Sequence, residues 1–247
     1  MEGMLKLYSP INELKQIGED IWIVDGNEIH MSFKLFKVPF TTRMTIVKID
    51  NNKLWIHSPI AFNKELNDKI KELGDIEHII APNKYHYSYV LDWYKHYPDA
   101  KVWLAKGVST KLKIDEGENF ISLDNISKTS WSEEIYFTPF RGSIAMEEMV
   151  FFHKKSSTLI LTDLIESIEV NKLPLLYKLV FKFGDNKYPK FRTSRDLRSS
   201  FIFKKQAKDS YSKIESWKPD KIVFSHGKII LENGTEKLKE AFYWLRK

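Results

Sequence analysis

The sequence predicts an α/β protein in which two mixed β-sheets carry helices on their outer faces. Segments rich in β-forming residues come first in hairpins, then alternate with helices, and then appear in pairs again. One parallel, doubly wound sheet fits this order less well. No Pro-, Gly- or Ser-rich linker divides the 247 residues, so the sequence indicates a single domain over residues 1–247.

The first third of the chain contains the hairpins and one helix. Residues 21–24 read as a strand, and 43–49 and 53–60 as two strands joined by a turn at Asp50-Asn51-Asn52. Residues 63–74 predict an amphipathic helix, because Leu66, Ile70 and Leu73 share one face and Gly74 can end it.

Strands and helices alternate in the middle of the chain. Residues 76–81 predict a buried strand, a helix begins at about Tyr87 and stops before Pro98, and 101–105 is another strand. Residues 107–130 carry no clear pattern. Further strands follow at 133–140 and in a hairpin over 147–165 that turns at Lys154–Ser157.

The last third is predicted to be mostly helical. Residues 166–217 are expected to form helices, with a basic helical insertion at about 166–216. Residues 221–230 form the last strand and its exit turn. A final helix follows, with Asn233 and Glu236 at the spacing of a capping box.

Composition narrows the chemistry. The chain has no cysteine, which excludes disulfides and cysteine-ligated metals, so any metal ion needs His, Asp or Glu ligands. The N-terminal segment lacks a basic stretch followed by an apolar run, and no apolar window is long enough to span a membrane. We therefore expect a soluble, cytoplasmic protein.

The positive charge is concentrated in one segment. Residues 172–208 hold eleven Lys or Arg and two Asp, a net charge of +9, while the whole chain carries +6. Within it, residues 173–183 have the pattern of a basic amphipathic helix, which can contact an anionic membrane surface or nucleic acid. Alternatively, its apolar face packs on the domain or on a second subunit of a homo-oligomer.

Four segments with polar ends follow one another in a recognisable order: "KLWIHSPI", "IIAPNKYHYSYV", "FFHKKSSTLILTDLI" and "IVFSHGKII". In this order they resemble the metallo-β-lactamase superfamily, and more closely an uncharacterised branch of it, a domain of unknown function. The resemblance runs from about Ile21 to Arg246. It implies a four-layer αββα sandwich.

The resemblance also implies a degenerate metal site. Active members carry His-x-His-x-Asp-His after the strand that ends here at Ala81. Without gaps, this sequence places Asn83, Tyr85, Tyr87 and Ser88 at the ligand positions, and His86 at a spacer position that only a shifted turn would aim inward. A later histidine ligand has its counterpart in "FTPFRGS", which offers Arg141.

Two ligand positions do match. Asp163 falls where the superfamily has its bridging aspartate, and His226 falls where it has its final histidine. His57 falls where the superfamily has an aspartate that lies behind the metal ligands. A single zinc or iron ion held by His86, Asp163 and His226, with His57 nearby as a possible fourth ligand, would suit a hydrolase site. We accordingly expect the protein to bind either no cofactor or a single metal ion.

Other readings of the same residues stay open. Asp163 can cap a following helix, and a His-Gly turn at 226–227 exposes its imidazole as a site would. Asn83, Tyr85 and the histidines can bind an unknown polar small molecule or do acid–base chemistry without metal. Arg141 binds an anion or pairs with a glutamate. His153 reads as structural, and His30, His78 and His96 carry no site signal.

The function classes follow from these alternatives. The leading one is a hydrolase of an unknown small molecule that uses at most one metal ion, with His86, Asp163 and His226 as catalytic residues. The second is a non-catalytic binding or interaction protein that has lost the metal. The third acts at a membrane surface or on nucleic acid through 172–208. The sequence has no GxSxG elbow and no glycine-rich phosphate loop.

Overall fold

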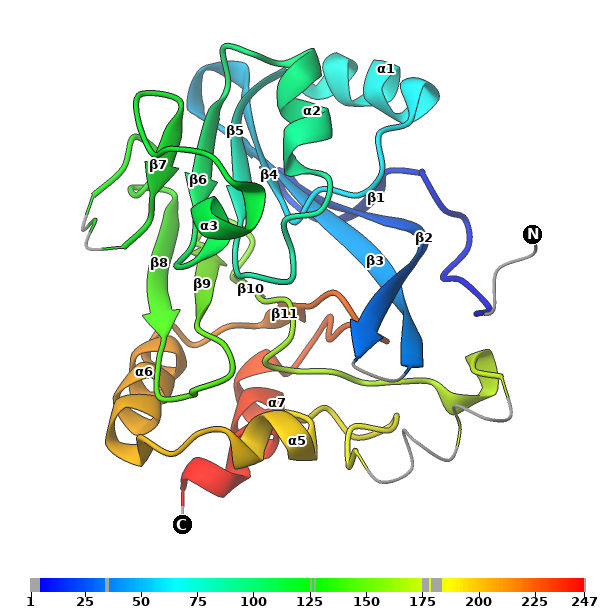
Figure 1. Cartoon of the computed structure of the whole chain (residues 1–247), viewed down its shortest axis with the longest axis vertical. Helices are drawn as coiled ribbons and strands as arrows, with labels where there is room; N and C mark the ends of the chain where they lie inside the picture. Colours follow the sequence, from blue (N-terminus) through cyan, green and yellow to red (C-terminus); the bar gives the residue numbers. More distant parts are fainter. Residues whose placement is uncertain are drawn as a thin grey trace.

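The computed structural model describes residues 5–33, 36–124, 126, 128–174, 178 and 184–246. Two β-sheets pack against each other, and helices cover their outer faces (Figure 1). This is the αββα arrangement predicted from the sequence. Among the described residues, no helix is long and apolar enough to cross a membrane.

The first sheet has seven strands in chain order. Its first four strands are antiparallel neighbours, and β4 to β7 run parallel. The strands are β1 (Lys15–Gly18), β2 (Ile21–Phe33), β3 (Phe36–Ile49), β4 (Lys53–His57), β5 (Asp75–Ala81), β6 (Lys101–Leu104) and β7 (Phe120–Ser122). The predicted turn at Asp50–Asn52 is the short helix η1, and Asn51 adopts the left-handed conformation there.

Three helices lie against this sheet: α1 (Lys64–Leu73), α2 (Val90–His96) and α3 (Val108–Leu112). Asn63 caps α1, because its side-chain oxygen accepts the backbone N–H of Leu66 over 2.8 Å. The buried residues Leu66 and Ile70 form the apolar face predicted from the sequence. Residues 107–130, which carried no clear pattern, contribute α3 and β7.

The second sheet has four strands in the order β11-β10-β9-β8. They are β8 (Ile135–Phe140), β9 (Glu148–His153), β10 (Thr158–Ile160) and β11 (Lys221–Val223). The last two are parallel and the others antiparallel. The outer face carries α6 (Lys204–Ser216) and α7 (Gly234–Ala241). The other helices of this half of the chain are short: η2 (Val170–Lys172), α5 (Arg195–Ser199) and η3 (Tyr243–Leu245).

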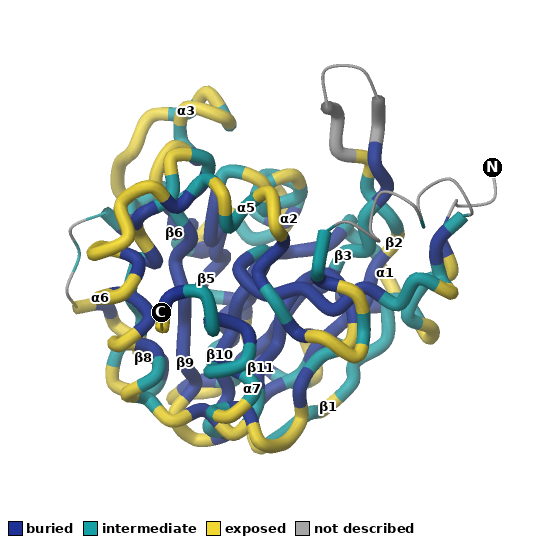
Figure 2. Tube along the Cα trace, turned by 90° about the horizontal axis from the view of Figure 1, so that it is seen from below, coloured by how far each residue is buried: buried dark blue, intermediate teal, exposed yellow. Residues whose placement is uncertain are grey.

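The core lies on both sides of the second sheet. Because side chains alternate along a strand, Phe151 faces the first sheet and Phe152 faces α6 and α7. Both residues are almost fully buried. Figure 2 shows these central strands as the buried interior, with the exposed residues mainly in the surrounding helices and loops.

Two predictions about local structure are wrong. The described residues from 166 to 203 are mostly irregular, with isolated bridges such as Glu166–Arg192, and the helices there are short. The predicted basic helix at 173–183 falls largely outside the described residues. The capping box at α7 does not form, because Asn233 takes a left-handed conformation and its side chain makes no capping hydrogen bond.

Part of the basic segment is neutralised internally. Lys190, Arg192 and Arg198 all lie within 3.0 Å of the Asp185 carboxylate. Burial alone would raise the pKa of Asp185, but hydrogen bonds from these three cations lower it well below its usual range. These charges therefore hold the segment together.

Candidate metal centre

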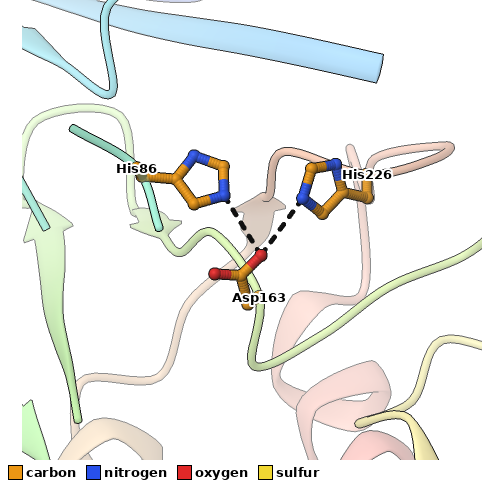
Figure 3. A group of neighbouring side chains, drawn as sticks. All are labelled: His86, Asp163 and His226. Carbon is orange, nitrogen blue, oxygen red and sulfur yellow. Dashed lines mark hydrogen bonds and ion pairs between the residues drawn. The ribbon is translucent and has the colours of Figure 1, made fainter. Parts of the chain in front are cut away.

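Three side chains from separate strand ends converge on one point. His86 lies on the turn after β5, Asp163 follows β10, and His226 follows β11. The Nε2 atoms of both histidines lie 3.1 Å from the same Asp163 oxygen, Oδ1 (Figure 3). The structure thus brings together the three residues that the resemblance implied as metal ligands.

Hydrogen bonding fixes the protonation of one imidazole. His226 Nδ1 lies 2.9 Å from the carbonyl oxygen of Thr41, and a carbonyl only accepts, so Nδ1 carries a proton. In the neutral ring, Nε2 then presents a lone pair to the Asp163 carboxylate. Two acceptors at 3.1 Å repel each other unless a cation, either a proton or a metal ion, lies between them.

The turn after β5 aims His86 inward. The Asn83 side-chain oxygen accepts the backbone N–H groups of Tyr85 and His86 over 2.8 and 3.0 Å. This tightens the turn in the manner of an Asx turn. The Ser58 hydroxyl lies 2.7 Å from His86 Nδ1 and orients the ring from behind. The turn therefore supplies the inward shift that His86 required.

The same asparagine also holds the aspartate. Asn83 Nδ2 donates to Asp163 Oδ2 and to Thr162 Oγ1, each over 2.8 Å. Since Oδ2 is occupied in this way, Oδ1 is left facing the two histidines. Asn83 is fully buried, and it acts here as the link between two ligands.

Glu148 is a site residue that the sequence analysis missed. Its carboxylate accepts the backbone N–H groups of Thr162 and Asp163 over 2.6 and 2.9 Å. Burial, and then the charge of Asp163, raise the pKa of Glu148 to about 7. The sequence offered one signal for Glu148, which is that it begins the apolar run "MVFF". A carboxylate at the start of a buried strand needs hydrogen-bond donors around it.

The histidines set the charge state of Asp163. Burial alone would raise the pKa of this carboxyl group. When the histidines are protonated, the charge of His86 and hydrogen bonds from both rings more than offset burial and lower the pKa of Asp163 far below its usual range. Asp163 is accordingly a carboxylate that can serve as a ligand.

A buried arginine fixes the turn that carries His226. Arg43 pairs with Asp25 over 2.7 Å, and its Nη1 donates to the carbonyls of Phe224 and Gly227 over 2.6 and 3.0 Å. Gly227 has a φ of 108°, and a Cβ there would lie 2.1 Å from the Ser167 carbonyl oxygen. Only glycine fits this turn.

A cavity of about 410 Å³ opens beside the two histidines of the group. His86 and His226 lie in its wall, and the neighbouring residues are mainly aromatic, hydroxyl-bearing or basic. His30, which carried no site signal in the sequence, also lines this cavity. Its volume is within the range of small-molecule sites.

The remaining predicted site residues divide into two groups. Tyr85 lines the cavity and is partly exposed, and burial followed by the charge of Asp163 raises the pKa of its hydroxyl group. Arg141 lines a separate hollow, where it lies 3.7 Å from Glu147. That ion pair is the second of the two alternatives considered for Arg141.

His57 is buried behind the site. Its ring stacks on Trp55 and meets Phe151 edge to face. Within the described part of the chain, its Nε2 has no hydrogen-bond partner. Burial, and then the charge of His86, lower the pKa of His57 to about 3, so it is neutral. Its neighbour Ser58 makes the contact with His86.

Several site alternatives from the sequence are resolved. Asp163 caps no helix, because the next helical turn, η2, begins at Val170. His226 is 3% exposed, so the expected exposure of its imidazole is wrong. His153 is buried and hydrogen-bonded to Ser156, as expected of a structural histidine.

The donor set fits one metal ion. The three ligand atoms lie within 4.8 Å of one another. With metal–ligand bonds of about 2.0–2.1 Å, two ligands of a tetrahedral ion are about 3.3 Å apart, close to the observed 3.1 Å. Two imidazoles and a carboxylate with an open side suit zinc or iron. Among the described residues, no second group of this kind occurs.

The architecture defines a protein of the metallo-β-lactamase fold. Among solved structures, the chain is similar to the DIM-1 metallo-β-lactamase, at 13% identity over 96% of this chain and 97% of that chain, with a TM-score of 0.62. It is also similar to a metallo-β-lactamase from Hirschia baltica, at 13% identity over 94% and 97% of the two chains and a TM-score of 0.57.

A third similar structure is the FIM-1 metallo-β-lactamase from Pseudomonas aeruginosa in its mono-zinc form. It is 11% identical over 92% of each chain, with a TM-score of 0.56. At such identities the likeness concerns the fold alone. A comparison with curated proteins gave no significant match.

The family is established by the sequence itself. The chain belongs to the family described as a domain of unknown function, DUF4336, whose model matches residues 19–201. The match includes His86 and Asp163 and ends before His226. The resemblance drawn from the sequence motifs is thereby confirmed.

Proposed function

We propose that this protein is a hydrolase of a small molecule that uses one metal ion held by His86, Asp163 and His226. The observation that carries the proposal is the contact between His226 Nε2 and the Asp163 carboxylate. Because Nδ1 donates to Thr41, the neutral ring and the carboxylate both offer lone pairs to the same point. A divalent cation at that point satisfies both.

The surrounding residues prepare the ligands in advance. Thr41 fixes the tautomer of His226, Ser58 orients His86, and Asn83 occupies the second oxygen of Asp163. Partners of this kind commonly determine the affinity of a metal site, because they remove the need to reorganise the ligands on binding. The three candidate ligands are therefore preorganised by their hydrogen-bond partners.

A bound zinc or iron ion would polarise a scissile carbonyl or phosphoryl group and acidify a water molecule. The chain itself supplies the cavity that receives the substrate. Tyr85 stays protonated at neutral pH, because burial and Asp163 raise its pKa. Its hydroxyl group can donate a hydrogen bond to a substrate oxygen and hold it in place. Related folds include an enzyme described in a mono-zinc form.

The second candidate is a binding protein without metal. It is favoured by the same distances if a proton, in place of a metal ion, lies between His226 and Asp163. An imidazolium–carboxylate cluster of this kind would hold the turns together and leave the cavity free to bind a ligand. Action through residues 172–208, a homo-oligomeric state and a cytoplasmic location stay predictions from the sequence.

Metal content separates the two candidates. Protein purified after supplementation with zinc, iron and manganese is analysed for metals, alongside His226→Ala and Asp163→Ala. We expect about one ion per chain in the wild type and little in either variant. His96→Ala is the matched control, since His96 is exposed and stacks on Phe62 outside the cavity. A wild type that stays free of metal would sink the proposal.

Activity is tested on the loaded protein. A panel of ester, amide, lactone and phosphodiester substrates is screened before and after removal of the metal with a chelator. We expect hydrolysis of at least one class, lost on chelation and restored by one metal. Stoichiometric metal binding without hydrolysis of any class would favour the non-catalytic candidate.

A further inference from the structure

The wall of the cavity beside His86 and His226 carries basic side chains. Its described lining includes Lys84, Lys111 and His30, and no aspartate or glutamate. A site lined by one sign of charge concentrates ligands of the opposite sign. The wall therefore favours an anion.

Neither lysine forms an ion pair with another described residue. In the part of the chain that the structure describes, no carboxylate lies within ion-pair distance of Lys84 or Lys111. Some lysines elsewhere are paired: Lys69 lies 2.6 Å from Glu13, and Lys155 lies 2.5 Å from Asp20. The cavity thus holds two cations that are available to a ligand.

The apolar part of the wall is aromatic. Phe40, Tyr85, Tyr87 and Tyr89 line the cavity, and Lys84 Nζ lies 5.6 Å from the centre of the Tyr85 ring. Such a cation–π contact keeps the ammonium group beside the ring. Aromatic walls bind flat apolar groups through stacked and edge-to-face contacts. The cavity volume of about 410 Å³ suits a small molecule.

From these features we infer that the cavity binds a small anionic molecule with a flat apolar body. Its carboxylate, sulfonate or phosphate group is held by Lys84 and Lys111, and its body lies against the tyrosine rings. That this molecule is also the substrate rests on the proposed hydrolase function. The binding of the anion itself requires no metal.

The test measures the binding of three probes to full-length, metal-free protein by titration calorimetry. The probes are 2-naphthoate, the uncharged 2-naphthamide, and octanoate, an anion without a ring. We expect 2-naphthoate to bind at least about tenfold more tightly than 2-naphthamide, because a charge-assisted contact is lost in the amide. Its affinity should fall as salt is added.

Variants assign the effect to the wall. Lys84→Met and Lys111→Met should each lower the affinity for 2-naphthoate by roughly three- to tenfold and leave the affinity for 2-naphthamide unchanged. Lys64→Met is the control, because Lys64 lies on α1 with a largely exposed side chain. Tyr85→Leu should lower the affinity for 2-naphthoate more than the affinity for octanoate, because octanoate has no ring to lie against the tyrosine.

Three results would overturn the inference. These are equal affinities for 2-naphthoate and 2-naphthamide, unchanged 2-naphthoate binding in both lysine variants, and binding of 2-naphthoate only to metal-loaded protein. The last result would assign the anion to the metal ion and leave the proposed hydrolase standing. Conversely, lysine-dependent binding by a protein that takes up no metal would overturn the hydrolase and leave the anion site.

Discussion

Asn83 Nδ2 donates a hydrogen bond to Asp163 Oδ2 over 2.8 Å, while the other end of the same amide accepts the backbone N–H of His86 over 3.0 Å. One buried side chain therefore fixes two of the three candidate ligands. In the resemblance drawn from the sequence, it aligns with a metal-binding histidine of the superfamily motif.

Replacing this side chain tests its role. Asn83→Ala leaves the partly buried N–H groups of Tyr85 and His86 without their acceptor and the buried Asp163 and Thr162 oxygens without their donor, so we expect a loss of about 3 kcal/mol in the free energy of unfolding. Metal affinity should fall by at least about tenfold. Asn67→Ala is the control, since Asn67 is a buried asparagine of α1 that bonds Tyr97. Equal metal affinity in both variants would contradict the assignment.

Glu148 gives a second prediction. Glu148→Gln places an amide NH₂ where a carboxylate accepts the backbone N–H of Thr162 or Asp163. We expect a loss of about 2–4 kcal/mol in unfolding free energy, because one buried donor faces another. Chemical denaturation and metal titration measure the two effects.

The adjacent residue supplies the control for this change. Glu147 is only partly buried and lies 3.7 Å from Arg141. Glu147→Gln should therefore alter the unfolding free energy by less than about 1 kcal/mol. If Glu148→Gln is no more destabilising than Glu147→Gln, the carboxylate does not hold the Asp163 backbone as we describe.

Arg43 should affect the site from a distance. Arg43→Met leaves Asp25 with Lys15 alone and frees the carbonyls of Phe224 and Gly227. We expect a loss of about 3–5 kcal/mol, as for other broken buried ion pairs, and weaker metal binding through the displaced His226 turn. Arg43→Lys keeps the charge, so its unfolding free energy and its metal affinity should lie between those of the wild type and Arg43→Met. Wild-type metal affinity in a folded Arg43→Lys protein would argue against this coupling.

His57 should make the protein sensitive to acid. Its pKa is about 3 in the folded chain and near 6.5 when unfolded. Between these values the unfolded chain binds the additional proton, so the contribution of His57 to the free energy of unfolding falls as the pH drops below about 6.5, by roughly 1.4 kcal/mol for each pH unit. His78 and His153, with pKa values lowered mainly by burial to about 4, add to the same trend.

His57→Phe isolates this contribution. The phenyl ring keeps the contacts with Trp55 and Phe151 and has nothing to protonate. Urea unfolding at pH 7 and pH 5 should show a loss about 2 kcal/mol smaller in the variant than in the wild type. An identical loss in the two proteins would exclude His57 as a source of the acid sensitivity. Retained metal binding would also exclude it as a ligand.

Some features of the fold could be predicted because they depend on local sequence. Most strands of the two sheets and α1 follow from apolar periodicity and turn residues, whereas β1 and β7 carried no such pattern. The ends of two predicted strands placed Asp163 and His226. The irregular course of the described residues between 166 and 203 could not be predicted, because isolated bridges such as Glu166–Arg192 depend on tertiary contacts. The capping box at α7 failed for a local reason, the left-handed backbone of Asn233.

The hydrogen-bond partners of the candidate ligands could not be predicted from the sequence for a different reason. Ser58, Glu148 and the Thr41 carbonyl reach the ligands from strands or turns distant in the chain. Ser58 stands in one of the motif segments and Glu148 begins an apolar run, but only the packing of the sheets shows which ligands they contact. An ungapped comparison also misplaces His86, because it cannot include the turn that Asn83 tightens.

The origin of the three ligands has a mechanical consequence. His86 follows a strand of the seven-stranded sheet, whereas Asp163 and His226 follow strands of the four-stranded sheet. An ion bound by all three would be a cross-link between the halves of the sandwich. Sliding of one half over the other would then break a ligand bond, so metal loading should slow hydrogen exchange in β5 and β10 together, on both sides of the seam.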